Sequence, residues 1–237
     1  MALALSVALI HADEPVREER VTSAGTIYRV VRLAPARVQL VWKNRQGLPF
    51  RSFEGVQADR QAKGEAVRFL MNAGIFEPGG IPSGLHIEAG QMLRPLNLAE
   101  APGNFFLKPN GVLVRHRDAR VTITTSEDWH RNPRDGVLWG IQSGPMLLID
   151  GHRHPAFTET SENRLHRNGV GVDGEGRLVF AITDRGQATN LWNFAGLFLQ
   201  LGCKNALFLD GDISALAVNP QAPVKSNLFG AMFVVSE

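Results

Sequence analysis

Short apolar runs that end in glycine, proline or asparagine recur along this sequence and restrict what the chain can fold into. Most are β-branched or aliphatic and too short for a helix, so they predict β-strands. The clearest runs are 26–33, 38–42, 66–71, 112–114, 121–123, 137–142, 146–149, 168–173, 177–182, 206–209 and 228–235. A chain interrupted this often is expected to build sheets, with few helices.

Two segments have the composition of helices. Residues 190–201 are rich in leucine and aromatic side chains, Thr189 or Asn190 can cap them, and Gly202 stands where a left-handed C-terminal residue belongs. Residues 57–65 are polar and alanine-rich. Because helices and strands do not alternate regularly, the predicted fold is α+β, with antiparallel or mixed sheets and two main helices.

The pattern also predicts three strand pairs. They are 26–33 with 38–42, 105–107 with 112–114, and 168–173 with 177–182. Asn110-Gly111 is a strong turn signal for the second pair, and Gly174-Glu175-Gly176 connects the third. Residues 126–135 are expected to form a polar connection.

Length and charge limit the possible classes of protein. At 237 residues the chain is most simply one domain, and a formal charge of +2 without basic runs does not indicate a nucleic-acid partner. No apolar run approaches the roughly 18 residues of a membrane-spanning helix. The single cysteine, Cys203, excludes an intrachain disulfide and is interpreted as a small core residue.

The first twelve residues are apolar and end in Ala12 before an acidic segment. They are similar to the back half of a secretory signal peptide, although the basic start of such a signal is missing. A short buried strand or helix is the alternative interpretation. The export signal predicts a periplasmic or secreted protein.

The run 206–209 is the most informative for function, because it stops abruptly at Asp210-Gly211-Asp212. Its length and composition suit a strand that is buried on both faces. Gly211 allows a sharp turn, so the two carboxylates can be aimed into a cleft, and Ser214 follows within reach. The alternative is an ordinary turn into the next strand.

Two other predicted strands end in a similar way, in a small-residue turn that carries an amide or a hydroxyl. These ends are Asn72-Ala73-Gly74 and Gln142-Ser143-Gly144. Together with the turn after Asp210 they predict a cleft in which backbone N–H groups and side-chain amides surround a polar ligand, such as a sugar or a phosphate.

Several charged residues near these ends are candidates for the same site, namely Glu77, Lys108, Arg164, Arg167 and Asp184. Arg167 can clamp a phosphate, or it can form a structural ion pair with Glu162 or Asp173. Lys108 can bind substrate or be a solvated hairpin residue.

The histidines give little indication of a metal site. Only His152-x-His154 has a ligand spacing, and it follows a turn in a loop that is expected to be exposed. We therefore expect neither a metal nor a cofactor.

Six motifs, in their order along the chain, resemble those of the phosphodiester glycosidase family, in particular its short exported bacterial branch. They lie at 71–76, 81–85, 103–111, 142–151, 167–172 and 201–211. The resemblance implies one domain over residues 25–236. It also implies a hydrolase that acts on a sugar joined to a phosphodiester.

The resemblance further implies a set of site residues. Asp210 would be the central acid, with Arg167 on the phosphate side and a second carboxylate from Glu77, Asp184 or Asp212. The resemblance assigns substrate binding to Asn72, Gly74, Gln142, Ser143, Gly144 and Asn168. Lys108, Asp212 and Ser214 are added as substrate-binding candidates because of their place in the sequence, and not by the resemblance. Asp212 departs from the Gly or Ser of many relatives, and its charge would repel a phosphate and raise the pKa of its neighbour.

The expected function is that of an exported hydrolase that cleaves a glycosyl-1-phosphodiester at the anomeric carbon. A phosphate monoester leaves more easily than a sugar alkoxide, so one carboxylate can suffice, as base or as nucleophile. The alternatives are a non-catalytic glycan-binding protein of the cell envelope and a structural envelope protein. For the first two functions the expected partner is a carbohydrate or a sugar phosphate.

Overall fold

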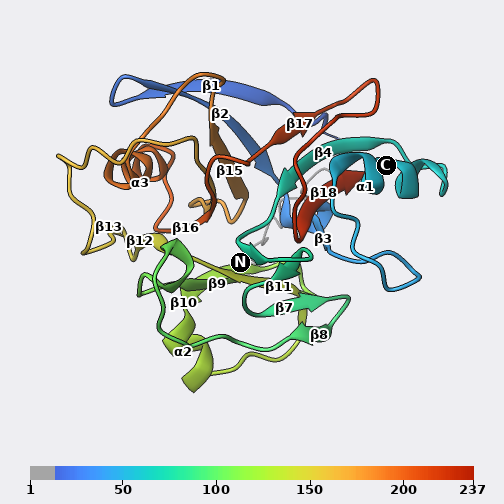
Figure 1. Cartoon of the computed structure of the whole chain (residues 1–237), viewed down its shortest axis with the longest axis horizontal. Coiled ribbons are helices and arrows are strands. Elements are labelled where there is room, and N and C mark those ends of the chain that lie inside the picture. Colours follow the sequence, from blue (N-terminus) through green and yellow to red (C-terminus); the bar gives the residue numbers. More distant parts are fainter. Residues whose placement is uncertain (1–13) are drawn as a thin grey trace, which may run out of the picture.

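Three β-sheets surround one shared hydrophobic core, as Figure 1 shows for the computed structural model of the chain. The structure describes residues 14–237, so the predicted export signal at residues 1–12 lies outside the described part. All strand pairings in the three sheets and in a small hairpin are antiparallel.

The strands are distributed as follows. The seven-stranded sheet has the order β1 (Glu18–Ser23), β2 (Thr26–Leu33), β15 (Leu178–Thr183), β14 (Asn168–Val172), β16 (Asn205–Asp210), β12 (Met146–Ile149) and β13 (His152–Arg153). The five-stranded sheet has the order β10 (Val121–Thr125), β9 (Gly111–His116), β11 (Val137–Ser143), β7 (His86–Glu88) and β8 (Gln91–Arg94). The four-stranded sheet has the order β17 (Leu216–Val218), β4 (Val67–Asn72), β18 (Met232–Ser236) and β3 (Gln39–Val41), and β5 (Phe76–Glu77) pairs with β6 (Ile81–Pro82).

Each sheet has one helix on its outer face. Phe53 of α1 (Phe53–Gln61) packs on the four-stranded sheet, Trp129 of α2 (Ser126–Arg131) on the five-stranded sheet, and Phe194 of α3 (Leu191–Gln200) on the seven-stranded sheet. Figure 1 shows the three helices on the outside of the molecule. No helix among residues 14–237 is long and apolar enough to cross a membrane.

Strand alternation explains how one sheet serves two cores. On β16, Leu207 and Leu209 face the shared core, whereas Ala206 and Phe208 face α3. Because successive side chains of a strand point to opposite faces, a strand with apolar residues at every position is buried on both sides. The prediction that 206–209 forms such a strand is confirmed.

Several other predictions from sequence are confirmed, beginning with the α+β class. β14 and β15 form the expected hairpin. Helix α3 starts after Asn190, whose Oδ1 accepts a hydrogen bond from the Asn193 N–H at 2.9 Å, and Gly202 follows with a φ of +82°. Cys203 is buried.

The predicted pairing of 26–33 with 38–42 is wrong. β2 pairs on one side with β15 and on the other with β1, a strand before residue 25 that sequence did not predict. Both edges of β2 are therefore occupied. A short 3-10 helix at Pro35–Arg37 carries the chain to β3, which instead pairs with β18.

The predicted hairpin at Asn110-Gly111 is also wrong. Residues Asn104–Phe106 form a 3-10 helix and not a strand. The side chain of Asn110 donates a hydrogen bond to the carbonyl of Phe105 at 2.7 Å, so it stabilises the bend locally instead of turning a hairpin. β9 instead forms its hairpin with β10, across residues 117–120, and pairs on its other side with β11.

A third helix, α2, replaces part of the polar connection predicted at 126–135. It has only six residues, too few to display a helical period in sequence. Its start is stabilised by Thr125, whose hydroxyl accepts a hydrogen bond from the Asp128 N–H at 3.0 Å.

Candidate active site

The ends of β4, β11, β14 and β16, which belong to three different sheets, meet at one edge of the shared core. Asn72 Nδ2 donates a hydrogen bond to Asp210 Oδ2 at 3.3 Å, and Ser143 Oγ donates one to the Leu209 carbonyl at 3.2 Å. Asn168 lies opposite Asp210 in the β14–β16 ladder. The three strand ends singled out in the sequence therefore converge.

A β-bulge directs Asp210 toward this edge. In the β14–β16 ladder Asn168 is opposite Asp210, but Gly169 is opposite Phe208, so Leu209 is an additional residue. With regular alternation, Asp210 would follow Phe208 toward α3. The bulge interrupts the alternation, and the carboxylate instead meets Asn72 of β4.

Neighbouring groups fix the side-chain amide of Asn72. Its Oδ1 accepts hydrogen bonds from Asn168 Nδ2 and from the Ala215 N–H, both at 3.0 Å. Two donors at the oxygen leave the amide nitrogen to face Asp210, so the hydrogen-bond network determines which way the amide points. Asn72 is 1% exposed.

Asp210 is half-buried and keeps access to solvent. Burial raises the pKa of its carboxyl to about 6, and the negative charge of Asp212 acts in the same direction. Hydrogen bonds from the Gly211 N–H, at 2.8 Å, and from Asn72 oppose this rise because they favour the charged form. A carboxyl with this pKa can take up or release a proton near neutral pH.

Two glycines let the chain pass close to the site. A Cβ at Gly74 would lie 3.3 Å from Ser143 Oγ, and Gly74 has a φ of +102°, which disfavours other residues. A Cβ at Gly144 would lie 2.5 Å from Asn110 Cβ and 2.8 Å from the Phe105 carbonyl. Both glycines are therefore required for close packing, whatever else they do.

Two further predicted substrate-binding residues lie in or beside the turn after Asp210. Asp212 is exposed, whereas Ser214 is buried. Within residues 14–237, neither Ser214 Oγ nor the buried Asn168 Oδ1 has a hydrogen-bond partner. These two atoms supply unused hydrogen-bonding capacity next to Asp210.

The structure places Gln142 away from Asp210. Its Oε1 accepts hydrogen bonds from the N–H groups of Leu85 and Asn97, at 3.1 and 2.9 Å, and its Nε2 donates to the Asn97 carbonyl and to Ser126 Oγ. All its hydrogen-bonding capacity is therefore used to hold residues 85–97 near α2. Ser143 points to the opposite face, as strand alternation requires.

Arg167 likewise points away from the face that carries Asn168. Its Nε donates to the Thr189 carbonyl at 2.8 Å and its Nη2 to the Asn163 carbonyl at 3.1 Å, while the guanidinium lies over the Phe208 ring. Arg167 is 1% exposed, and burial lowers its pKa to about 10, with the charge of Asp212 acting in the opposite direction. The side chain is therefore a buried positive charge behind the site.

Neither predicted ion pair of Arg167 is formed. Asp173 pairs with Arg177 at 2.9 Å, and within residues 14–237 no carboxylate oxygen lies within 4 Å of the Arg167 guanidinium. One nitrogen, Nη1, also has no hydrogen-bond partner in this part of the chain. An unpaired buried cation makes the surrounding potential positive.

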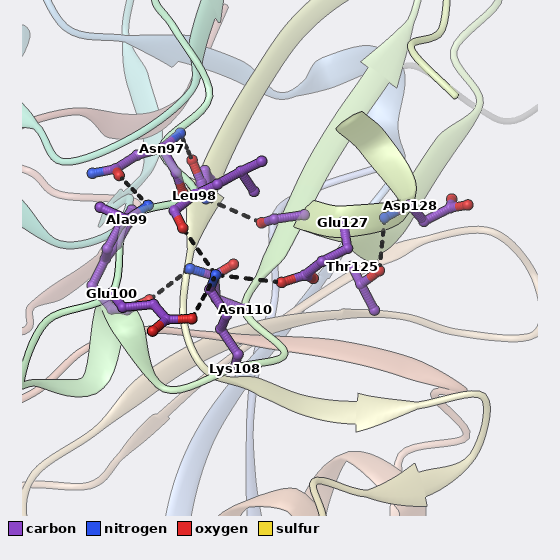
Figure 2. A network of polar contacts seen from close by, with 12 residues as sticks. Asn97, Leu98, Ala99, Glu100, Lys108, Asn110, Thr125, Glu127 and Asp128 are labelled. Carbon is purple, nitrogen blue, oxygen red and sulfur yellow. Dashed lines mark hydrogen bonds and ion pairs between the residues drawn. The ribbon is translucent and has the colours of Figure 1, made fainter. Parts of the chain in front are cut away.

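Figure 2 shows that Lys108 belongs to a separate network. Its Nζ donates to the Leu98 carbonyl at 2.9 Å and lies 4.0 Å from Glu100 and 3.9 Å from Glu127. The lysine thus ties the segment before it to the start of α2. The structure gives Lys108 a local supporting role, and its predicted contact with substrate stays a prediction.

The remaining predicted carboxylates have other partners. Exposed Glu77 accepts a hydrogen bond from Ser83 Oγ at 3.1 Å, and Asp184 pairs with Arg20 at 3.0 Å. No hydrogen bond among residues 14–237 joins either of them to Asp210. Arg164 donates to the Ala188 carbonyl.

His154 differs from the sequence prediction because it is buried and not exposed. Its Nδ1 accepts a hydrogen bond from the Ala156 N–H at 3.1 Å. Among residues 14–237 no group of three or more His, Cys, Asp or Glu side chains is arranged to hold a metal ion.

Sequence reasoning missed His166. Its Nδ1 lies 2.6 Å from Thr183 Oγ1, and its Nε2 lies 3.2 Å from the carbonyl of Ser214, in the turn that follows Asp210. Its position two residues before Asn168 could have indicated it, because side chains two residues apart in an extended segment lie on the same face.

Two large hollows of the described chain lie elsewhere. One, of about 960 Å³, lies beside β1 and β2, and the other, of about 810 Å³, lies between β10 and the strands β12, β14 and β16. Neither is lined by Asp210 or by the other predicted site residues.

Comparison with known proteins identifies relatives in sequence. A family model described as phosphodiester glycosidase matches residues 65–231. The uncharacterized protein YigE of Escherichia coli K12 is 35% identical over 179 residues, which cover 75% of this chain and 68% of that protein.

Several solved structures share the fold, including the following two. The catalytic domain of zebrafish N-acetylglucosamine-1-phosphodiester alpha-N-acetylglucosaminidase, auto-inhibited by its pro-peptide, superimposes with a TM-score of 0.67 at 17% identity, covering 96% of this chain and 85% of that one. A putative exported protein of Burkholderia pseudomallei has a TM-score of 0.57 at 12% identity, covering 89% and 74%.

Proposed function

The chain belongs to the phosphodiester glycosidase family, and on that basis we propose that it hydrolyses glycosyl-1-phosphodiesters between the anomeric carbon and the phosphate oxygen. The observation that carries the proposal is the environment of Asp210. This half-buried carboxylate is oriented by Asn72 and has a pKa of about 6, raised mainly by burial.

In the proposed reaction Asp210 acts as a general base. Above its pKa the ionised carboxylate accepts a proton from water while the water oxygen attacks the anomeric carbon. The bond from that carbon to the phosphate oxygen breaks, and the phosphate monoester leaves with the electron pair. The products are the free sugar and the phosphate monoester.

One carboxylate can be sufficient because the leaving group is already a weak base. Protonation by a second acid is therefore less necessary than in the hydrolysis of a sugar alkoxide. The buried charge of Arg167, which has no carboxylate within 4 Å in the described chain, favours negative charge nearby and would help to stabilise the departing phosphate.

The proposal is tested by offering the purified protein a methyl diester of a sugar 1-phosphate, beginning with N-acetylglucosamine. We expect free sugar and methyl phosphate, with kcat lowered by about 10²- to 10⁴-fold in Asp210→Asn. Asp150→Asn, in the turn between β12 and β13, is a matched control because Asp150 lies outside the site. Absence of sugar release over a panel of sugar-1-phosphodiesters would overturn the proposal.

The base role also predicts stereochemistry. Direct attack by water inverts the configuration of the anomeric carbon, whereas a covalent intermediate on Asp210 would retain it. Proton NMR of the sugar formed first, before its anomers equilibrate, distinguishes the two. Tight binding of sugar phosphates without turnover would favour a glycan-binding protein instead.

We also propose that the protein is exported, because residues 1–12 resemble the apolar part of a secretory signal. Fusing residues 1–24 to a phosphatase that is active only outside the cytoplasm tests this directly. Activity is expected with the natural segment, and activity that persists after Leu5→Arg and Leu9→Arg would contradict export through this segment.

A further inference from the structure

We propose that His166 is a positioning residue for Asp210, acting through the turn that connects Asp210 to β17. Only the expected effect of His166 on turnover rests on the proposed function. His166 Nε2 lies 3.2 Å from the Ser214 carbonyl, and Nδ1 lies 2.6 Å from Thr183 Oγ1. The ring thus connects the end of β15 to the turn after β16.

The hydrogen-bond partners determine the tautomer of the ring. A carbonyl oxygen only accepts, so Nε2 must carry a hydrogen that it donates to Ser214. Thr183 Oγ1 accepts a hydrogen bond from the Arg167 N–H at 3.1 Å and therefore has its own hydrogen available for His166 Nδ1. The result is one directed chain from the Arg167 backbone through Thr183 and His166 to Ser214.

This series of hydrogen bonds ends in the turn after Asp210, which supports the Asp210 carboxylate on two sides. Within the turn, the Ser214 N–H donates to the Gly211 carbonyl at 2.9 Å. At one end, the Gly211 N–H donates to Asp210 Oδ1, and at the other, the Ala215 N–H donates to Asn72 Oδ1. Gly211 and Asn72, the two groups of the described chain that donate to the Asp210 carboxylate, therefore depend on the position of the turn.

His166 is assigned to positioning and not to proton transfer because both ring nitrogens are occupied. The hydrogen on Nε2 is donated to a backbone carbonyl, and Nδ1 receives the hydrogen of Thr183. Without the ring, Ser214 would lose the link that joins its carbonyl to β15. The turn could then shift, and a displacement of about 1 Å at a catalytic group can cost about 10²-fold in rate.

The tautomer can be tested without any substrate. Nitrogen-15 NMR of the histidine-labelled protein should assign a protonated Nε2 and a bare Nδ1 to His166, identified by its absence in His166→Gln. Thr183→Val removes the hydroxyl donor and should change the Nδ1 shift. A protonated Nδ1 with a bare Nε2 in the neutral ring would overturn the proposal.

A pair of amide variants tests the positioning role. The amide nitrogen of His166→Gln can occupy the place of Nε2 and donate to Ser214, whereas the shorter His166→Asn cannot reach it. We expect kcat to fall by about 10- to 100-fold in His166→Asn and to stay within about threefold in His166→Gln, with KM little changed in both. Equal losses in the two variants would contradict the role.

The decisive readout is the titration of Asp210 itself. Loss of the hydrogen bonds from Gly211 and Asn72 should raise the pKa of Asp210 in His166→Asn, since both bonds lower it and Asp212 still raises it. Carbon-13 NMR of the carboxyl measures this even if no substrate is found, which separates failure of this proposal from failure of the proposed function. An unchanged Asp210 titration in a folded His166→Asn protein would overturn the proposal.

Discussion

Asn72 holds Asp210 from a strand that lies 138 residues earlier in the chain, through a hydrogen bond from Nδ2 to Oδ2 at 3.3 Å. The same amide accepts hydrogen bonds from Asn168 and from the backbone of Ala215. One side chain therefore connects β4, β14 and the turn after β16. The orientation of the proposed catalytic carboxylate is a property of the whole assembly and not of the Asp210 turn alone.

The raised pKa of Asp210 should make stability depend on pH. Between its ordinary pKa, near 3.8, and about 6, the folded state binds more protons than the unfolded state, so stability is lost as pH rises through this window. Asp210→Asn removes this loss. Relative to wild type, we expect the variant to gain about 1–2 kcal/mol between pH 4 and pH 7.5, measured by urea unfolding. A difference that does not change with pH would contradict the prediction.

The charge of Asp212 should also affect the pKa of Asp210. This negative charge raises the pKa of Asp210, so Asp212→Asn should lower that pKa. If Asp210 must be ionised to act as a base, the acid side of the pH–rate profile will move to lower pH. The profile of kcat/KM checks this, with Glu175→Gln, in the β14–β15 turn, as a distant control. A shift to higher pH would exclude the proposed electrostatic coupling.

Gly84 should be intolerant of any side chain. A Cβ there would lie 2.2 Å from Gln142 Oε1 and 2.8 Å from Phe105 Cζ, and this oxygen accepts hydrogen bonds from the N–H groups of Leu85 and Asn97. We expect Gly84→Ala to lower the free energy of unfolding by about 2–4 kcal/mol. Gly174→Ala is the control, because nothing lies within 4 Å of its added Cβ. Similar stabilities for the two variants in denaturant melts would show that the contact is relieved easily.

Lys108 should matter for local stability more than for catalysis. It binds the Leu98 carbonyl and lies near Glu100 and Glu127, and no hydrogen bond in the described chain connects it to Asp210. We expect Lys108→Met to lose about 0.5–1 kcal/mol of stability and to keep kcat/KM within about twofold. A large rise in KM at unchanged stability would instead support the substrate contact expected from sequence.

Cys203 should be chemically inert in the folded protein. Burial raises the pKa of its thiol to about 12, so the reactive thiolate is scarce at pH 8. Ellman's reagent should detect no thiol in the native protein and one per chain in denaturant. Rapid reaction of the native protein would show that the region between α3 and β16 opens readily.

Two pairs of adjacent residues show which part of the site could be predicted from sequence. The motif Gln142-Ser143 and the pair Arg167-Asn168 were each assigned as a unit to the site. In the structure Ser143 and Asn168 face the shared core, whereas Gln142 and Arg167 are buried on the opposite faces of their strands. Because successive side chains of a strand point to opposite faces, the two members of such a pair cannot lie on the same face. Alternation alone does not say which of the two faces the shared core.

The α+β class, the buried strand before Asp210, the capped helix α3 and the family could all be predicted from the residues alone. These features depend on local composition, periodicity and turn chemistry, or on motifs that persist in order along the chain. The contact of Asn72 with Asp210, the bulge that turns this carboxylate away from α3, and the contact of His166 with the turn were visible only in the folded chain. These contacts join segments far apart in sequence, and their geometry is set by the packing of three sheets around a common core.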